Sequence, residues 1–153
     1  MKRLPRPLLL LAALAALFGG CQNIGELVVT GLQVELKAVE YHGAGATTAD
    51  VTVVNPNVVS YLIAGIKAKV YLNDTFIGTL AAKGPLGLPP QGRLDQAMTL
   101  VPAGGAAGQI VAEAARSGSA RYRLDTILDI QMVGTKHEQG EVTQSGTVAV
   151  TGK

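Results

Sequence analysis

The sequence predicts an all-β domain, an antiparallel β-sandwich of about seven strands with one short α-helix. Apolar and polar residues alternate along most of the chain, and this period of two is typical of half-buried strands. The alternating stretches are short, and Gly, Pro and Asn residues that favour turns separate them. One alanine-rich stretch, residues 106–116, has its apolar residues at helical spacing instead.

The first half of the domain has the most regular pattern. Residues 32–38, 50–53 and 66–72 each alternate between the two faces of a strand. Asn73-Asp74 follows the third stretch, and both residue types tolerate the positive φ angles of a two-residue hairpin turn. This turn predicts three pairs of opposite residues: Leu72 with Thr75, Tyr71 with Phe76, and Val70 with Ile77.

The second half predicts the remaining elements. Residues 94–100 form a further strand with a looser pattern. The helix is expected from Ala106 to Arg116, since Ser117-Gly118 is typical of a helix C-terminus. Residues 123–132 and 142–150 alternate again and predict the last two strands.

The N-terminal segment indicates export. Three basic residues precede an apolar run from Leu8 to Phe18, and Gly19 and Gly20 lead to Cys21, the only cysteine of the chain. The run is shorter than the roughly 20 apolar residues that cross a hydrocarbon core, so a secretory signal is predicted. A signal that ends at cysteine resembles the lipobox of bacterial lipoproteins, which implies acylation of Cys21. A conventional cleavage site and a free thiol remain the alternatives.

These features divide the chain into a removable signal peptide at residues 1–20, a lipid-anchored tether at 21–26 and a β domain at 27–153. Five to ten residues span at most about 35 Å, so we expect the domain to work close to the membrane. Gln22, in place of Asp, resembles the sorting pattern of outer-membrane lipoproteins. In a Gram-negative bacterium the exported protein would therefore be anchored to the periplasmic face of the outer membrane.

The net charge of the whole chain is +2, and the basic residues of the predicted signal peptide account for its positive sign. Without Lys2, Arg3 and Arg6, ten basic residues face eleven acidic ones, a formal charge of −1. The chain contains only six aromatic residues and no basic stripe, which argues against nucleic-acid binding.

One motif resembles a known family. Residues 51–57 end in Asn55-Pro56-Asn57, and the strand at 66–72, the turn Asn73-Asp74 and the sequence Phe76-Ile77-Gly78 follow. This order resembles the late embryogenesis abundant (LEA) group 2 proteins, which carry the water stress and hypersensitive response (WHy) domain. The resemblance covers roughly residues 27–151, including the strand at 146–150. It implies a β-sandwich of fibronectin III or immunoglobulin type with a helix, a link to stress and desiccation tolerance, and frequent occurrence as bacterial lipoproteins.

The chemistry of Asn55-Pro56-Asn57 favours a structural turn over a binding role. Pro56 has no amide hydrogen and restricts Asn55 to extended geometry, so the motif ends a strand. The side chain of Asn57 can bond to neighbouring backbone, and asparagine accepts a left-handed conformation.

The sequence shows no catalytic or metal-binding constellation. His42 and His137 lack the spacing of metal ligands, and no serine lies in a Gly-x-Ser-x-Gly elbow. Asp125 and Asp129 share a strand face, but four residues place their backbones roughly 13 Å apart. Glycosidase carboxyl groups lie closer than that. We therefore expect no enzyme activity, no metal and no cofactor. Arg121 and Arg123 on the same face indicate a solvated ladder of charges instead.

Two functions from different classes remain. The first is a lipid-anchored, non-catalytic envelope protein that protects or contacts other proteins near the membrane during water stress. The alternative is a module that binds a lipid or another apolar ligand between the sheets or near the helix. A well-formed apolar pocket of some hundreds of Å³ would favour the alternative, and a solid interior would favour the first.

Overall fold

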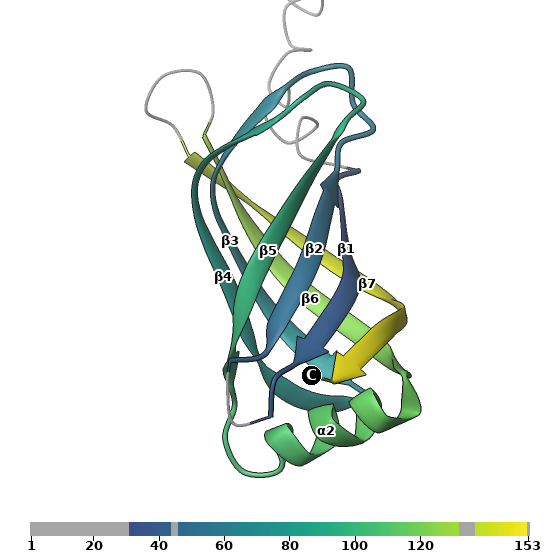
Figure 1. The fold of residues 1–153 in the computed structure, drawn as a ribbon. Helices are drawn as coiled ribbons and strands as arrows, with labels where there is room; N and C mark the ends of the chain where they lie inside the picture. The colour runs from purple at the N-terminus through teal and green to yellow at the C-terminus, as the bar shows by residue number, and fades with distance from the viewer. Residues whose placement is uncertain (1–30, 44–45, 132–136, 153) are drawn as a thin grey trace, which may run out of the picture. The chain divides into compact units, whose positions relative to one another are not determined.

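Alternating strands account for most of the structure, a computed structural model that describes residues 31–43, 46–131 and 137–152 (Figure 1). The described residues belong to one compact unit, Gly31–Lys153. The predicted signal peptide, the tether and Cys21 lie outside the described residues. The elements, in chain order, are β1 (Gln33–Tyr41), β2 (Thr48–Val54), β3 (Tyr61–Leu72), β4 (Thr75–Leu88), β5 (Arg93–Pro102), α2 (Ala107–Ser117), β6 (Ser119–Gln131) and β7 (His137–Gly152).

The strands form one closed barrel in the order β1-β2-β5-β4-β3-β6-β7. Neighbours are antiparallel except β1 and β7, which run parallel and complete the ring. The prediction of an antiparallel sandwich of fibronectin III or immunoglobulin type is therefore wrong, because a barrel has no pair of separate sheets. The all-β class is confirmed, and the described residues contain seven strands and one short helix.

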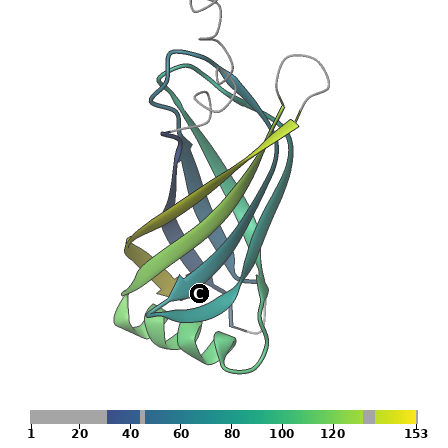
Figure 2. The same cartoon turned by 180° about the vertical axis from the view of Figure 1, so that it is seen from behind.

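Two short seams close the barrel, and both lie at the end covered by α2 (Figure 1, Figure 2). β4 pairs with β5 through Gly78–Leu80, and β1 pairs with β7 through Ala38–Tyr41. Gly78 makes the first seam possible, because a Cβ atom there would lie 2.3 Å from the carbonyl oxygen of Val101. Alternation has the same period of two in a sandwich and in a barrel, so the pattern could not distinguish them.

The hairpin between β3 and β4 confirms two of the three predicted pairs. Leu72 lies opposite Thr75 and Tyr71 opposite Phe76, while Asn73 and Asp74 take φ angles of 47° and 66° in the turn. Val70 lies opposite Gly78 instead of Ile77, because the register shifts by one residue between Val70 and Tyr71. The shift is a β-bulge, which leaves Ile77 unpaired and fully buried.

Inward-facing apolar side chains from the strands fill the barrel, and α2 covers one end. Ala107, Val111 and Ala114 form the buried face of the helix, and Gly118 ends it with a φ angle of 78°. In the described part of the chain, no helix has both the length and the hydropathy needed to cross a bilayer. The largest side chains exposed by less than 2% are Ile63, Ile66, Leu72, Ile77, Leu80, Leu88, Leu124, Leu128 and Ile130.

Candidate functional site

The β2–β3 and β4–β5 loops meet at the end of the barrel opposite α2 (Figure 1, Figure 2). The side chain of Asn55 joins them and is only 1% exposed. Its Nδ2 donates to the carbonyl oxygens of Val59 (2.7 Å) and Pro89 (2.8 Å), one in each loop. Its Oδ1 accepts from the backbone N–H of Asn57 at 2.9 Å. Both amide hydrogens and the oxygen are thus satisfied, as a buried amide requires.

Backbone hydrogen bonds reinforce this junction of two loops. The N–H of Asn55 donates to the Gly92 carbonyl at 2.9 Å, and the N–H of Gln91 donates to the Asn57 carbonyl at 2.8 Å. The structure thus places Asn55 and Asn57 in a turn that also holds a second loop. Sequence reasoning missed this second loop, because Pro89 lies 34 residues from Asn55 and no local pattern connects them.

Tyr61 lies beneath the same turn, at the start of β3. Its side chain is 6% exposed and forms a hydrogen bond with the side chain of Asn57. Burial raises the pKa of the Tyr61 hydroxyl above its ordinary value of 10.0, and the hydrogen bond to Asn57 offsets part of that rise. The phenol therefore stays neutral at physiological pH and contributes to packing.

The surface of these two loops is apolar and nearly uncharged. Val58 is 77% exposed and Val59 is 45% exposed. Residues 55–62 and 86–93, which form the two loops and the adjoining strand ends, contain no acidic residue and one basic residue, Arg93. Exposed apolar side chains that lie together without charges favour an interaction.

A hollow of about 500 Å³ lies on the outer face of β3, β4, β6 and β7. Charges of both signs line it, and Ile127 adds an exposed apolar side chain. It is therefore different from the apolar pocket inside the barrel that the ligand-binding alternative requires. The outward-facing side chains that line it are Lys67, Lys69, Thr79, Ala81, Asp125, Ile127, Glu141 and Thr143.

The predicted charge ladder on β6 borders this hollow. Arg123 Nε lies 3.5 Å from Asp125 Oδ1, and its guanidinium carbon lies 4.0 Å from the centre of the Tyr71 ring. Asp125 Oδ1 also accepts from the Thr143 hydroxyl at 3.2 Å. Solvent reaches all of these groups, so each pair contributes at most about 1 kcal/mol.

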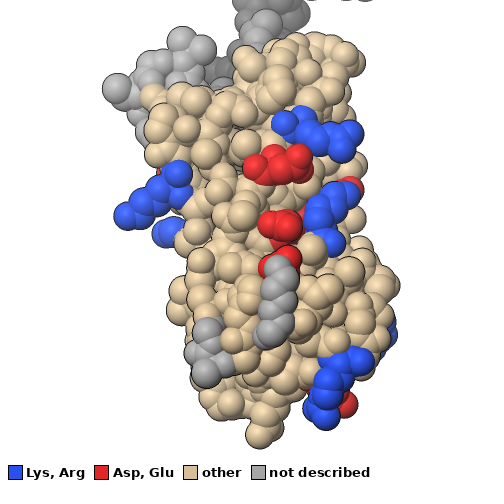
Figure 3. Space-filling view, viewed as in Figure 1, with Lys and Arg blue, Asp and Glu red and all other residues tan. Residues whose placement is uncertain are grey.

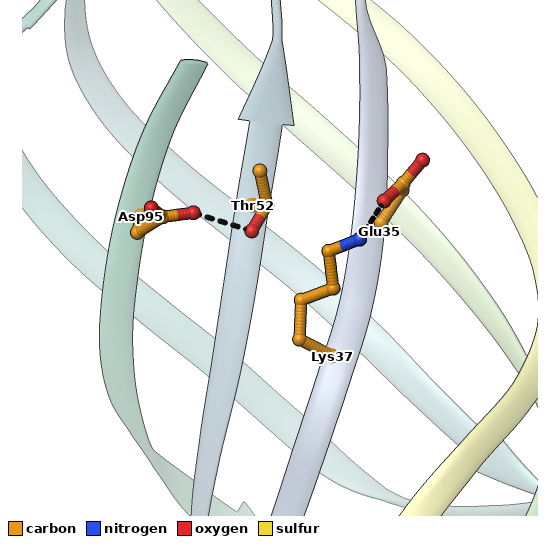
Figure 4. Close-up of polar contacts among 4 residues, drawn as sticks. All are labelled: Glu35, Lys37, Thr52 and Asp95. Carbon is orange, nitrogen blue, oxygen red and sulfur yellow. Dashed lines mark hydrogen bonds and ion pairs between the residues drawn. The ribbon is translucent and has the colours of Figure 1, made fainter.

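A second polar cluster lies on the outer face of β1, β2 and β5, where Figure 3 shows acidic and basic side chains gathered together. Thr52 lies between Glu35 and Asp95 in the sheet register. Its hydroxyl donates to Asp95 Oδ1 at 2.6 Å, and Lys37 forms an ion pair with Glu35 (Figure 4). Thr52 is 3% exposed although it points outward, so this cluster shields the sheet from water.

The remaining candidates do not assemble into a reactive site. His42 Nε2 lies 3.7 Å from Glu40 Oε2, and the side chain of His137 lies outside the described part of the chain, as does Cys21. Among the side chains that the structure describes, no three His, Cys, Asp or Glu residues converge as metal ligands would.

No protein-family model and no curated protein sequence matches the chain. Solved structures do match it. A protein from Arabidopsis thaliana, AT1g01470, aligns with a TM-score of 0.52 and 18% identity over 78% of this chain and 78% of that chain. A candidate late embryogenesis abundant protein, At2g46140.1, aligns with a TM-score of 0.51 and 16% identity over 95% of this chain and 86% of that chain.

The fold is LEA-like. This agrees with the resemblance found around Asn55-Pro56-Asn57, although identities of 16–18% extend only to the fold. The LEA-like fold leaves the WHy assignment and the bacterial lipoprotein assignment as predictions.

Proposed function

We propose that this chain is a LEA-like stress protein of the bacterial cell envelope, with a WHy-type domain held at a membrane by acyl chains on Cys21. The observation that carries the proposal is the LEA-like barrel behind a segment that ends in a lipobox-like cysteine. We propose a non-catalytic role, in which the domain protects or contacts client proteins near the membrane during water stress.

The surface chemistry supports a protective role over a catalytic one. Charges of both signs alternate on the outer faces of the barrel, as in the pairs Arg123–Asp125 and Lys37–Glu35. Exposed charged and hydroxyl groups can keep hydrogen bonds to neighbouring proteins when water becomes scarce, because each has donors or acceptors beyond those used by its internal partner. Large apolar side chains occupy the barrel interior, which gives no support to the alternative of an internal apolar ligand.

Two measurements test the proposal. Mass spectrometry of the membrane-extracted protein should find acyl chains on Cys21, and Cys21→Ala should shift the protein out of the membrane fraction. Survival of the producing cells after drying should fall when the gene is deleted and return with the wild-type chain. An unmodified Cys21 would contradict the anchor, and unchanged survival would contradict the stress role.

A further inference from the structure

We propose that the loop end of the barrel, formed by Val58, Val59, Leu62 and the β4–β5 loop, docks onto the lipid surface that carries the anchor. This inference rests on the proposed acylation of Cys21 and adds an orientation to it. The domain would stand on the membrane by this end, with α2 directed away from it.

The position of Gly31 supports the orientation. Gly31 is the first described residue, and a methyl group placed on it would lie 3.5 Å from Cγ of Pro56. The chain therefore enters the domain beside the β2–β3 loop. Cys21 precedes Gly31 by ten residues, which span at most about 35 Å when fully extended. β1 alone is about 30 Å long at roughly 3.3 Å per residue, so a tether that starts here reaches the far end only when stretched along the barrel.

The composition of the loop end suits an interfacial contact. Val58 is 77% exposed, Val59 is 45% exposed and Leu62 is 38% exposed, so these side chains can enter the boundary between headgroups and acyl chains. Residues 55–62 and 86–93 have no carboxylate to desolvate or to be repelled by anionic lipid, while Arg93 is exposed and can pair with a lipid phosphate.

The rigidity of the loop end also favours docking. Asn55 and the backbone bonds of Gln91 and Gly92 hold the two loops together, so the apolar side chains are presented without further ordering. The opposite end also exposes Val101 and Phe76, but it carries the exposed charges of Asp74, Arg121 and Arg116. Contact of that end with lipid would require the desolvation of these charges.

The test uses the full, acylated chain in vesicles of phosphatidylethanolamine and phosphatidylglycerol. Because Cys21 is the only cysteine, Val58→Cys supplies a single free thiol for a fluorophore once Cys21 is acylated. Gln109→Cys, an exposed position on α2, is the matched control at the other end. Nitroxide groups on the lipids should quench the fluorescence of the label at position 58. The fluorescence of a label at position 109 should equal that measured with lipids that carry no nitroxide. Val59→Asp in the Val58→Cys chain should abolish the quenching.

The outcomes separate the orientation from the anchor. Intact acylation with equal or absent quenching at both positions would overturn the docking and leave the anchor in place. An unacylated Cys21, detected as a second labelled site by mass spectrometry, would overturn both. The fluorophore at position 58 could also be shielded from aqueous quenchers in the absence of lipid, with a native mass twice that of one chain. This result would show that the loop end binds a second copy of the chain, and it would overturn the lipid contact.

Discussion

At the scale of single residues, Asn55 connects two loops that are far apart in the sequence. Replacement by alanine removes three side-chain hydrogen bonds and leaves the Pro89 carbonyl without this partner. We expect Asn55→Ala to lower the free energy of unfolding by about 2–3 kcal/mol. Urea denaturation measures the change, and Gln109→Ala on the exposed face of α2 is the control. Equal midpoints for the two variants would contradict the connecting role.

Tyr61 makes the stability of the folded domain depend on pH. Its pKa lies above the ordinary value of 10.0 in the folded protein, since burial disfavours the phenolate. Above pH 10 the unfolded chain loses this proton before the folded chain does, so the free energy of unfolding falls as the pH rises. Absorbance titration of tyrosinate should show a late-titrating group that Tyr61→Phe removes. If Tyr61→Phe removes an early-titrating group instead, the pKa shift has the opposite sign.

At the scale of elements, Gly78 determines how β4 meets β5. A side chain at this position would collide with the Val101 carbonyl, and its φ angle of 153° is one that other residues rarely adopt. We expect Gly78→Ala to reduce stability by about 1–3 kcal/mol, because the seam must open or the backbone must strain. Gly87→Ala in the same strand meets no atom within 4 Å and should change stability by less than about 0.5 kcal/mol. Thermal or urea unfolding of both variants compares them, and similar losses would contradict the role of the seam.

The same seam shows how far the sequence could predict the structure. Alternation identified Val34 and Val53 as buried, and the Ser117-Gly118 signal identified the end of the helix, because these features depend on neighbours in the chain. The closure of the barrel depends on pairs between segments far apart in the chain, such as Thr79 with Val101 and Val39 with Val150. Likewise, Pro56 predicted the turn, while the bond from Asn55 to Pro89 could not be inferred from either segment alone.

At the scale of the whole molecule, the two ends of the barrel differ in charge. The loop pair beside Gly31 is apolar with one basic residue, whereas the α2 end combines the exposed Val101 with the exposed charges of Asp74, Arg116 and Arg121. If acyl chains hold the first end at a membrane, the mixed-charge sides of the barrel face whatever protein lies alongside. Anchoring then raises the effective concentration of the domain around membrane-bound clients without any new contact.

This difference predicts that protection depends on the anchor only for membrane-bound clients. We expect Cys21→Ala to protect a soluble enzyme during drying as well as the acylated chain does, because the barrel is unchanged. For an enzyme embedded in the same vesicles, the acylated chain should reach half-maximal protection at a protein concentration about 10²-fold lower than the Cys21→Ala chain. Recovered enzyme activity after rehydration measures both cases. Equal protection of the embedded enzyme by the two chains would show that anchoring contributes nothing to protection. If neither chain protects the soluble enzyme, the protective role itself is wrong.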